Sequence, residues 1–319
     1  MSENIPGIHH VTAIAGDPRR NLAFYAGVLG LRLVKRTVNY DDPNTYHLYY
    51  GDESGRPGTI LTFFPWPGAP RGSDGTGQGT VTAFSIPARS MEYWMERLAG
   101  DGIAWEGPSR RFDESSLSFA DPDGLRLELR DDPGAEAEPA WKAGPVPPEF
   151  AVRGLHGVTL ALDAHEGTAS LLTEVMGFRR VASEGDRIRY QAANGALASR
   201  VDLLALPGSP RGRMGVGVVH HVAWRTSDDE EQRAWRARIA AHGLHPTPVY
   251  DRQYFRSVYF REPGGVLFEI ATDTPGFGVD ETPERLGTGL KLPPWLEPDR
   301  QRIERILPPL ETPGVSKAR

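Results

Sequence analysis

The sequence has 319 residues, of which 39% are hydrophobic and 24% charged, so it can bury sizeable cores in about two domains. It contains no cysteine, which excludes disulfides, thiolate metal sites, iron–sulfur clusters and cysteine nucleophiles. The net charge of −6 argues against nucleic acid or an anionic membrane as a partner. The sequence shows neither a signal segment nor an apolar run that could span a bilayer, which predicts a cytoplasmic protein.

The predicted elements repeat four times along the chain. Each unit has an apolar strand, a helix that ends at a glycine, and three further strand-like runs, so it reads βαβββ. The glycines that end the four helices are Gly30, Gly102, Gly177 and Gly243. Val11, Val158 and Val222 mark the first strands of units one, three and four, at nearly equal distances before those glycines. The matched offsets predict an α+β fold made of four βαβββ modules.

A segment rich in Pro, Ala and Glu separates the first two units from the last two. It covers residues 136–153, and its composition is typical of a semi-extended linker. We therefore expect an N-terminal domain of two modules at residues 1–135. A C-terminal domain of two modules and a tail is expected at residues 154–319. The tail is predicted to hold a short amphipathic helix, from Asp299 to Leu307, and to cover one of the domains.

Two histidine pairs occupy equivalent strands of units one and four, as His9-His10 and His220-His221. Glu269 lies in the apolar closing strand of unit four, where an unpaired buried carboxylate would be costly. Because side chains alternate along a strand, His10 and His221 share the position just before the marker valine. Two histidines and one carboxylate are the ligand set of a non-heme Fe(II) site that uses oxygen. We therefore predict that His10, His221 and Glu269 bind a metal.

The other two units lack this ligand set. At the position of His10 and His221 they carry Gly157 in unit three and Thr82 or Ala83 in unit two. At the position of Glu269 the remaining units carry Thr62, Glu128 and Asp202. His156 aligns with the first histidine of each pair, and His47 alternates with tyrosines, so neither is expected to be a ligand. A simpler alternative is that the histidine pairs are structural, but two equivalent pairs and a matching glutamate favour the metal site.

At these residues the chain resembles the vicinal oxygen chelate superfamily (glyoxalase, bleomycin resistance protein, extradiol dioxygenase), and within it the hydroquinone-type ring-cleaving dioxygenases. The matching stretches are Gly7–Thr12, Val38–Asp42, Thr45–Asp52, Val219–Ala223, Asp251–Phe255, Ser257–Gly265 and Leu292–Pro298. The resemblance covers nearly the whole chain and implies modules paired into open curved sheets. Catechol-cleaving members take their first histidine from module three, where this chain has Gly157. The hydroquinone-type arrangement fits better, so modules one and four would share the metal.

The resemblance implies an Fe(II)-dependent extradiol-type dioxygenase, with Mn(II) as the other metal, that degrades hydroquinones or related dihydroxy aromatics. Its expected partners are a small aromatic substrate and O₂, and a homo-oligomer is left open. The metal ligands carry over onto His10, His221 and Glu269. Substrate-handling positions carry over onto His9, Thr12, His220, Arg252 and Tyr259.

Each of these substrate-handling positions has an expected role. His9 and His220 would transfer protons, because imidazole titrates near neutral pH. Arg252 would hold a distal hydroxyl, and Tyr259 would hydrogen-bond the metal-bound oxygen. The alternatives are a sheet-edge salt bridge for Arg252 and simple packing for Tyr259.

Two other functions compete with ring cleavage. A glyoxalase-type isomerase with a redox-inert metal usually needs a carboxylate where this chain has Thr62. A non-catalytic ligand-sequestering module is usually one short pair of modules without the predicted triad. Both are therefore disfavoured, and O₂ uptake with hydroquinones separates all three.

Overall fold

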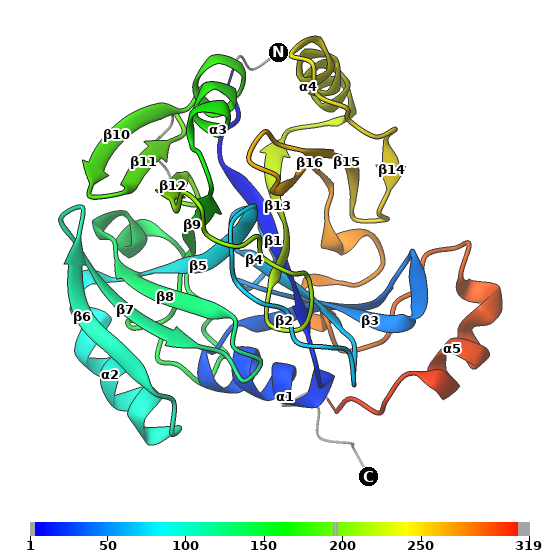
Figure 1. Ribbon diagram of the computed structural model, residues 1–319. Coiled ribbons are helices and arrows are strands. Elements are labelled where there is room, and N and C mark those ends of the chain that lie inside the picture. Colours follow the sequence, from blue (N-terminus) through cyan, green and yellow to red (C-terminus); the bar gives the residue numbers. More distant parts are fainter. Residues whose placement is uncertain (1–3, 194, 196, 312–319) are drawn as a thin grey trace.

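The computed structural model describes residues 4–193, 195 and 197–311. Its strands form two curved eight-stranded sheets, which confirms the α+β fold predicted from the repeats (Figure 1). The first sheet has the order β14-β15-β16-β13-β1-β4-β3-β2. The second has the order β10-β11-β12-β9-β5-β8-β7-β6. The two orders correspond strand for strand, as expected for a repeated unit.

The bounds of the elements follow the four predicted units. The first sheet comprises β1 (Ile8–Ala15), β2 (Arg32–Asn39), β3 (Asp42–Gly51), β4 (Ile60–Pro65), β13 (Val219–Thr226), β14 (Tyr250–Asp251), β15 (Phe255–Arg261) and β16 (Leu267–Pro275). The second comprises β5 (Gln78–Ile86), β6 (Trp105–Arg111), β7 (Glu114–Ala120), β8 (Arg126–Asp131), β9 (Gly154–Leu162), β10 (Arg179–Glu184), β11 (Arg187–Gln191) and β12 (Arg200–Ala205). The α-helices are α1 (Pro18–Leu22), α2 (Met91–Gly100), α3 (Glu166–Ser170), α4 (Asp229–Ala241) and α5 (Arg300–Ile306). Shorter helical turns are η1 (Ala23–Val28), η2 (Ala88–Ser90), η3 (Pro133–Ala137), η4 (Leu171–Val175), η5 (Phe277–Val279), η6 (Pro283–Arg285) and η7 (Glu297–Asp299).

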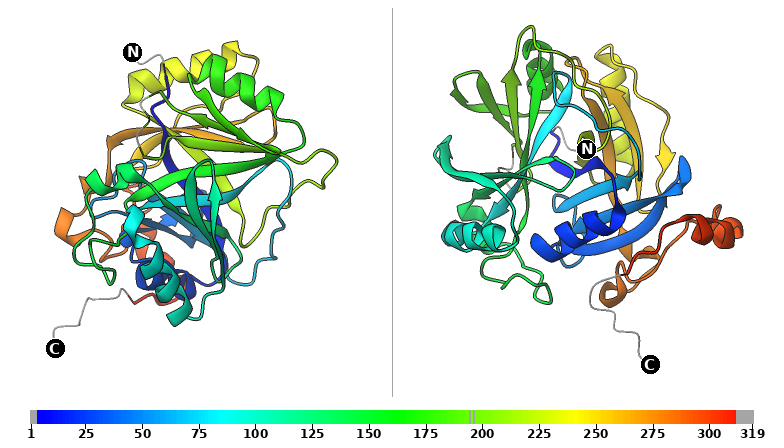
Figure 2. Two further views of the ribbon diagram at one scale, coloured as in Figure 1. Left: turned by 90° about the vertical axis from the view of Figure 1, so that its left-hand side faces the viewer. Right: turned by 60° about the horizontal axis from the view of Figure 1, so that its bottom comes forward.

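Each sheet joins one unit from each half of the sequence. In the first sheet β1 pairs antiparallel with β13, and Val11 faces Val222. In the second, β5 pairs antiparallel with β9, and Thr82 faces Val158. The pairing of unit one with unit four, which a shared metal requires, is therefore confirmed. Figure 2 shows how strands from both ends of the chain lie side by side in the first sheet.

The strand register is the same in all four units. The marker residue of each first strand pairs with the residue just before the predicted closing-strand position: Val11 with Leu61, Thr82 with Leu127, Val158 with Val201 and Val222 with Phe268. The equivalence of Thr62, Glu128, Asp202 and Glu269 is thereby confirmed. One detail was wrong: Val81, rather than Thr82 or Ala83, occupies the place of His10 in unit two. Unit two has Thr82 where the other units have the marker valine, so the sequence gives no valine from which to count back to this position.

The helices of the four units end as the sequence predicts. The glycines after them have φ of +68° at Gly30, +71° at Gly102, +78° at Gly177 and +82° at Gly243. This left-handed conformation costs glycine little, because it has no Cβ. Helices α1 and α2 lie at one end of the molecule, and α3 and α4 lie at the other (Figures 1 and 2).

The C-terminal tail covers the first sheet, as predicted. Tyr46 of β3 donates a hydrogen bond to the carbonyl of Pro308 at 2.9 Å. Lys35 of β2 is fully buried, and its Nζ lies 2.5 Å from Asp280 and 2.6 Å from Glu281. A buried ammonium is stable only when paired, so these two carboxylates fix the start of the tail. Helix α5 confirms the predicted amphipathic helix.

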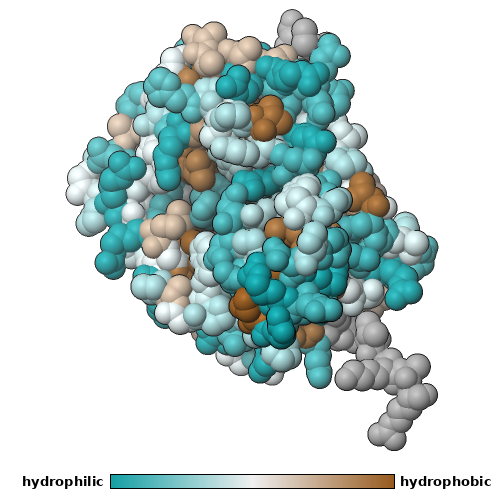
Figure 3. Space-filling model, turned by 90° about the vertical axis from the view of Figure 1, so that its right-hand side faces the viewer, coloured by the Kyte–Doolittle hydropathy of each residue, from teal (hydrophilic) through white to brown (hydrophobic). Residues whose placement is uncertain are grey.

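The face that carries α5 and β14 is mostly hydrophilic, with hydrophobic side chains scattered over it (Figure 3). Exposed large hydrophobic side chains include Tyr250 of β14 and Ile306 of α5. Single exposed apolar side chains are ordinary on a protein surface. No helix in the described part of the chain is both long and apolar enough to cross a membrane.

We predict that the two sequence halves do not hold the metal when they are produced separately. Fragments of residues 1–140 and 150–319 would each leave the β1–β13 seam unpaired, because the seam needs one strand from each half. Metal content after anaerobic loading, measured for each fragment and for the two produced together, checks this. Tight metal binding with turnover by the C-terminal fragment alone would contradict it.

Candidate metal centre

His10, His221 and Glu269 come together in the middle of the first sheet, and all three are buried. His10 Nε2 lies 3.3 Å from His221 Nε2 and 3.5 Å from Glu269 Oε2. His221 Nε2 lies 2.9 Å from the same oxygen. The pairing of β1 with β13 brings the two histidines together, and the parallel pairing of β13 with β16 adds the glutamate.

The arrangement of the three donor atoms suits binding of a shared metal better than hydrogen bonding among the three side chains. Glu269 Oε2 is buried without a hydrogen-bond partner, although His221 Nε2 is only 2.9 Å away. The contact therefore has the length of a hydrogen bond but not its direction. Two metal–ligand bonds of about 2.1 Å at a right angle hold their donor atoms about 3 Å apart. The observed spacings agree with that value, so the donor set suits a divalent transition metal that keeps other positions open.

The first histidine of each pair orients the second. His10 Nδ1 lies 2.9 Å from His9 Nδ1, and His221 Nδ1 lies 2.8 Å from His220 Nδ1. Each contact joins two Nδ1 atoms, so one imidazole of the pair donates and the other accepts. When the second histidine donates from Nδ1, its Nε2 keeps a lone pair at the centre of the triad, as metal binding requires.

The protonation states of the site suit metal binding. Burial lowers the pKa of His221 and outweighs the opposing effect of Glu269. Burial would raise the pKa of Glu269, but His10 and His221 hold the pKa of that carboxyl well below its usual range. Ser257 Oγ donates a hydrogen bond to Glu269 Oε1 at 2.5 Å and fixes the carboxylate. Neutral imidazole and ionised carboxylate are the forms that bind a metal.

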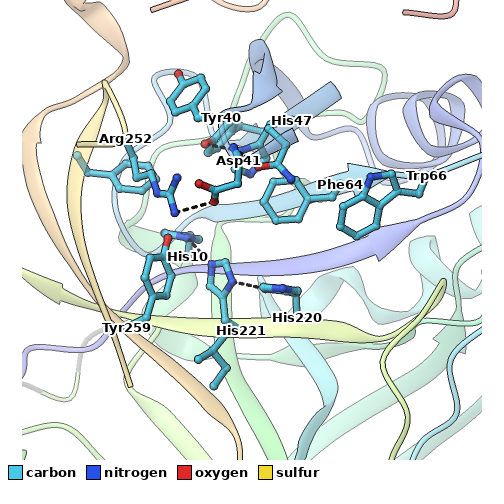
Figure 4. Close-up of a pocket in the computed structure, with 14 residues that line it drawn as sticks. His10, Tyr40, Asp41, His47, Phe64, Trp66, His220, His221, Arg252 and Tyr259 are labelled. Carbon is cyan, nitrogen blue, oxygen red and sulfur yellow. Dashed lines mark hydrogen bonds and ion pairs between the residues drawn. The ribbon is translucent and has the colours of Figure 1, made fainter. Parts of the chain in front are cut away.

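A cavity of about 320 Å³ opens over His10 and His221 (Figure 4). Its wall is mainly aromatic, and its rings belong to Tyr40, His47, Tyr49, Phe64, Trp66, His220, Phe255 and Tyr259. Asn39, Asp41, Arg252 and Leu267 complete the lining. This volume is near the lower end of the range for small-molecule sites, about 300–1,000 Å³. The cavity therefore suits a single substituted ring.

The structure brings three of the five predicted substrate-handling residues to the cavity. His220, Arg252 and Tyr259 line it, whereas His9 and Thr12 do not. His9 lies at the edge of the His10 ring that faces away from the triad. Thr12 Oγ1 instead pairs with Thr62 Oγ1 at 2.8 Å.

Arg252 and Tyr259 face each other in the cavity wall. Burial lowers the pKa of Arg252, but Tyr259 and Asp41 raise it more, so the guanidinium stays charged. Burial and the charge of Glu269 raise the pKa of Tyr259, so its phenol keeps a proton to donate. Arg252 also forms an ion pair with Asp41, so it is both a pocket residue and a salt-bridge partner.

Sequence reasoning missed part of the cavity wall. Asp41, Phe64 and Trp66 were not singled out, although Asp41 lies in a stretch that carries the family resemblance. His47 was not expected to be a metal ligand, and it lies outside the triad although it lines the cavity. Its Nε2 pairs with Thr62 Oγ1 and its Nδ1 with the Tyr49 hydroxyl, each at 2.8 Å.

The corresponding place in the second sheet is filled by ion pairs. His156 Nε2 lies 3.1 Å from Glu114 Oε1, and Arg189 Nη1 lies 2.5 Å from Glu114 Oε2. Arg130 pairs with Glu128 at 2.7 Å, so this buried carboxylate is neutralised. The remaining space is only about 10 Å³. In the second sheet, guanidinium groups thus neutralise the buried carboxylates. In the first sheet, two histidines surround the single buried carboxylate of Glu269.

Comparisons with known proteins agree with this fold. The family described as "Glyoxalase/Bleomycin resistance protein/Dioxygenase superfamily" matches residues 7–129 and 154–270. The chain is 50% identical to the "Putative ring-cleaving dioxygenase MhqO" of Bacillus subtilis, over 98% of each protein. It is 35% identical to the "Chlorohydroquinone/hydroquinone 1,2-dioxygenase" of Sphingobium indicum, over 96% of this chain and 97% of that protein. A crystal structure from Bacillus subtilis matches with a TM-score of 0.94 and 49% identity, over 98% of this chain and 99% of that one.

The fold is that of a metal-dependent superfamily with paired βαβββ modules. The chain belongs to the glyoxalase/bleomycin resistance protein/dioxygenase superfamily. The predicted enzyme class, a ring-cleaving dioxygenase, is confirmed by its full-length relatives.

We expect His10→Ala and Glu269→Gln each to abolish binding of Fe(II) or Mn(II), because each change removes one of three donor atoms. His156→Ala is the matched control, since this buried histidine lies in the second sheet and pairs with Glu114. Metal per chain after anaerobic loading is the measurement, with circular dichroism to show that each variant folds. Retention of metal by His10→Ala together with its loss from His156→Ala would contradict the assignment.

Proposed function

We propose that this protein is an Fe(II)-dependent extradiol-type dioxygenase that opens the ring of hydroquinones or related dihydroxy aromatics. The observation that carries the proposal is the cluster of His10, His221 and Glu269 below an aromatic cavity of one-ring size. Identity over almost the full length to a chlorohydroquinone/hydroquinone 1,2-dioxygenase supports the same substrate class. Mn(II) suits the same donor set, since neither imidazole nor carboxylate selects strongly between the two.

The proposed metal would be held by His10 Nε2, His221 Nε2 and Glu269 Oε2. When bound, such a metal supplies a Lewis acid, a template and an electron relay to O₂. The chain's own contribution is to fix these three donors in their binding protonation state. Ser257 holds the carboxylate, and the first histidine of each pair holds the tautomer of the second.

The cavity wall would position the ring. Phe64, Trp66 and Phe255 offer apolar faces that can pack against an aromatic substrate and keep water away from it. A hydroquinone places its two hydroxyls at opposite ends of the ring. One hydroxyl would then lie toward the triad while the other reaches the rim, where Arg252 can donate a hydrogen bond. Orientation of this kind can lower a reaction barrier by several kcal/mol.

His220 and Tyr259 would provide protons near the reacting oxygen atoms. Burial and the neighbouring His221 lower the pKa of His220 to about 3, so its imidazole is neutral at physiological pH. A metal on His221 Nε2 would require the proton of His221 on Nδ1, where it donates to His220 Nδ1. The proton of the neutral His220 would then be on Nε2, which makes it a hydrogen-bond donor. Tyr259 keeps its phenolic proton, and its ring centroid lies 5.6 Å from that of His221. Two neutral donors thus flank the place where negative charge would develop on oxygen.

His9 and Thr12 support the site without lining the cavity. His9 would set the tautomer of His10, which is a positioning role rather than the proton transfer expected from the sequence. Thr12 bonds Thr62, the residue at the place where an isomerase of this fold would need a carboxylate. Thr62 also bonds His47, so its hydroxyl is committed to the wall. These contacts favour ring cleavage over isomerisation.

We predict that the protein consumes O₂ with methylhydroquinone and has a higher specificity constant for it than for methylcatechol. Arg252→Ala should lower kcat/KM for methylhydroquinone by at least about tenfold, because the distal hydroxyl loses its donor. Metal content should not change, since Arg252 contacts none of the three donor atoms. An oxygen electrode on anaerobically loaded protein gives the rates.

Arg256→Ala is the control for this prediction, because Arg256 pairs with Asp251 and does not line the cavity. A preference for methylcatechol that Arg252→Ala leaves unchanged would place the protein with the catechol-cleaving members. No O₂ uptake with either compound would favour the isomerase or the sequestering module.

A further inference from the structure

An ion pair crosses the rim of the cavity, opposite the proposed metal ligands. Asp41 comes from the turn between β2 and β3, and Arg252 comes from the segment between β14 and β15. Arg252 Nη2 donates to Asp41 Oδ2 at 2.9 Å (Figure 4). Both residues line the cavity. The turn of unit one and the segment of unit four thus meet over the site that these units share.

The two side chains of this ion pair differ in their burial and in their contacts with neighbouring residues. The Arg252 side chain is only 17% exposed, and its guanidinium carbon lies 5.3 Å from the ring centre of Tyr250 and 5.5 Å from that of Tyr259. The Asp41 side chain is 72% exposed. An ion pair with one such exposed partner is weak, because water screens it. The guanidinium is therefore a fixed donor, and the carboxylate can shift to accommodate a ligand.

Asp41 balances the charge at this rim. Among the cavity-lining residues of the described chain, Arg252 supplies a guanidinium and Asp41 a carboxylate, whereas the others have imidazole, aromatic, amide or aliphatic side chains. Two nearby acids do not line the cavity themselves: Asp42 accepts hydrogen bonds from Asn44 and from Trp66 Nε1, and Asp251 pairs with Arg256. The rim thus presents one fixed donor and one acceptor side by side, with no net charge.

We propose that Asp41 is a specificity-determining residue that, together with Arg252, selects rings with a neutral distal hydroxyl and rejects rings with a carboxylate at that end. This inference rests on the proposed function for its substrate class. A hydroxyl can donate to Asp41 and accept from Arg252 at the same time. A carboxylate cannot donate, and its charge meets that of Asp41. Without Asp41, Arg252 would instead bind such a carboxylate strongly, because guanidinium and carboxylate form paired hydrogen bonds.

Two small molecules of matched shape test the proposal. Hydroquinone and 4-hydroxybenzoate share one phenolic hydroxyl and differ at the opposite end of the ring, which is a hydroxyl in one and a carboxylate in the other. Asp41→Asn keeps the size of the side chain and removes its charge. We expect this change to tighten binding of 4-hydroxybenzoate relative to hydroquinone by about tenfold, which corresponds to 1.4 kcal/mol.

The measurement is equilibrium binding to the metal-loaded protein without O₂, followed by quenching of tryptophan fluorescence, since Trp66 lies in the cavity wall. Inhibition of methylhydroquinone turnover by 4-hydroxybenzoate gives a second value. Asp251→Asn is the control, because it removes an acid next to Arg252 that does not line the cavity. The gain should disappear in the double variant Asp41→Asn/Arg252→Ala.

An unchanged ratio of the two affinities in Asp41→Asn would overturn the role of Asp41, and so would an equal shift in Asp251→Asn. Failure of wild-type protein to bind hydroquinone would overturn it as well. If the ratio shifts as expected but no ring compound supports O₂ uptake, the rim selects as proposed and the dioxygenase function is wrong.

Discussion

The antiparallel pairing of β1 with β13 is the interaction on which the site depends. Val11 and Val222 face each other at its centre, and both are fully buried. Side chains on a strand alternate between faces, so a slip of one residue in this register would move His10 or His221 away from the triad. The burial of this seam on both sides makes such a slip costly. Hydrophobic packing of the β1–β13 pair therefore fixes the positions of His10 and His221 in the triad.

The seam also explains why the chain needs both halves. Neither half contains the complete ligand set, because His10 lies in unit one while His221 and Glu269 lie in unit four. The second sheet has the same seam, made by β5 and β9, but without histidines at the corresponding positions. There, arginines neutralise the buried carboxylates and fill the space. One scaffold thus satisfies buried carboxylates in two ways, by guanidinium groups in one sheet and by imidazoles suited to a metal in the other.

Much of this arrangement could be predicted from the sequence because it depends on local periodicity. Repeat spacing predicted the four units and the glycines that end their helices, and strand parity brought His10, His221 and Glu269 together. The alignment failed in β5, where Thr82 replaces the marker valine and Val81, rather than Thr82 or Ala83, takes the place of His10. The boundary between the sequence halves at residues 136–153 stays a prediction.

The cavity wall was harder to predict, because it depends on how turns from distant units meet. Asp41 lies in a short turn, and its sequence neighbours give no sign that it reaches Arg252. His9 and Thr12 were placed near the substrate by resemblance, whereas their contacts are with His10 and Thr62. The linker region also packs more than its composition suggests, since Val146, Ala151 and Val152 are buried. Such contacts follow from the assembled sheets rather than from any one segment.

Units one and four are proposed to bind one metal ion between them, through three named atoms. The most direct measurement is anomalous X-ray diffraction from crystals loaded with Fe(II) or Mn(II) under anaerobic conditions. The account predicts one strong peak per chain, about 2.0–2.2 Å from His10 Nε2, His221 Nε2 and Glu269 Oε2. No peak should occur near His156 and Glu114. A peak in the second sheet, or none at the triad in fully loaded protein, would contradict the account.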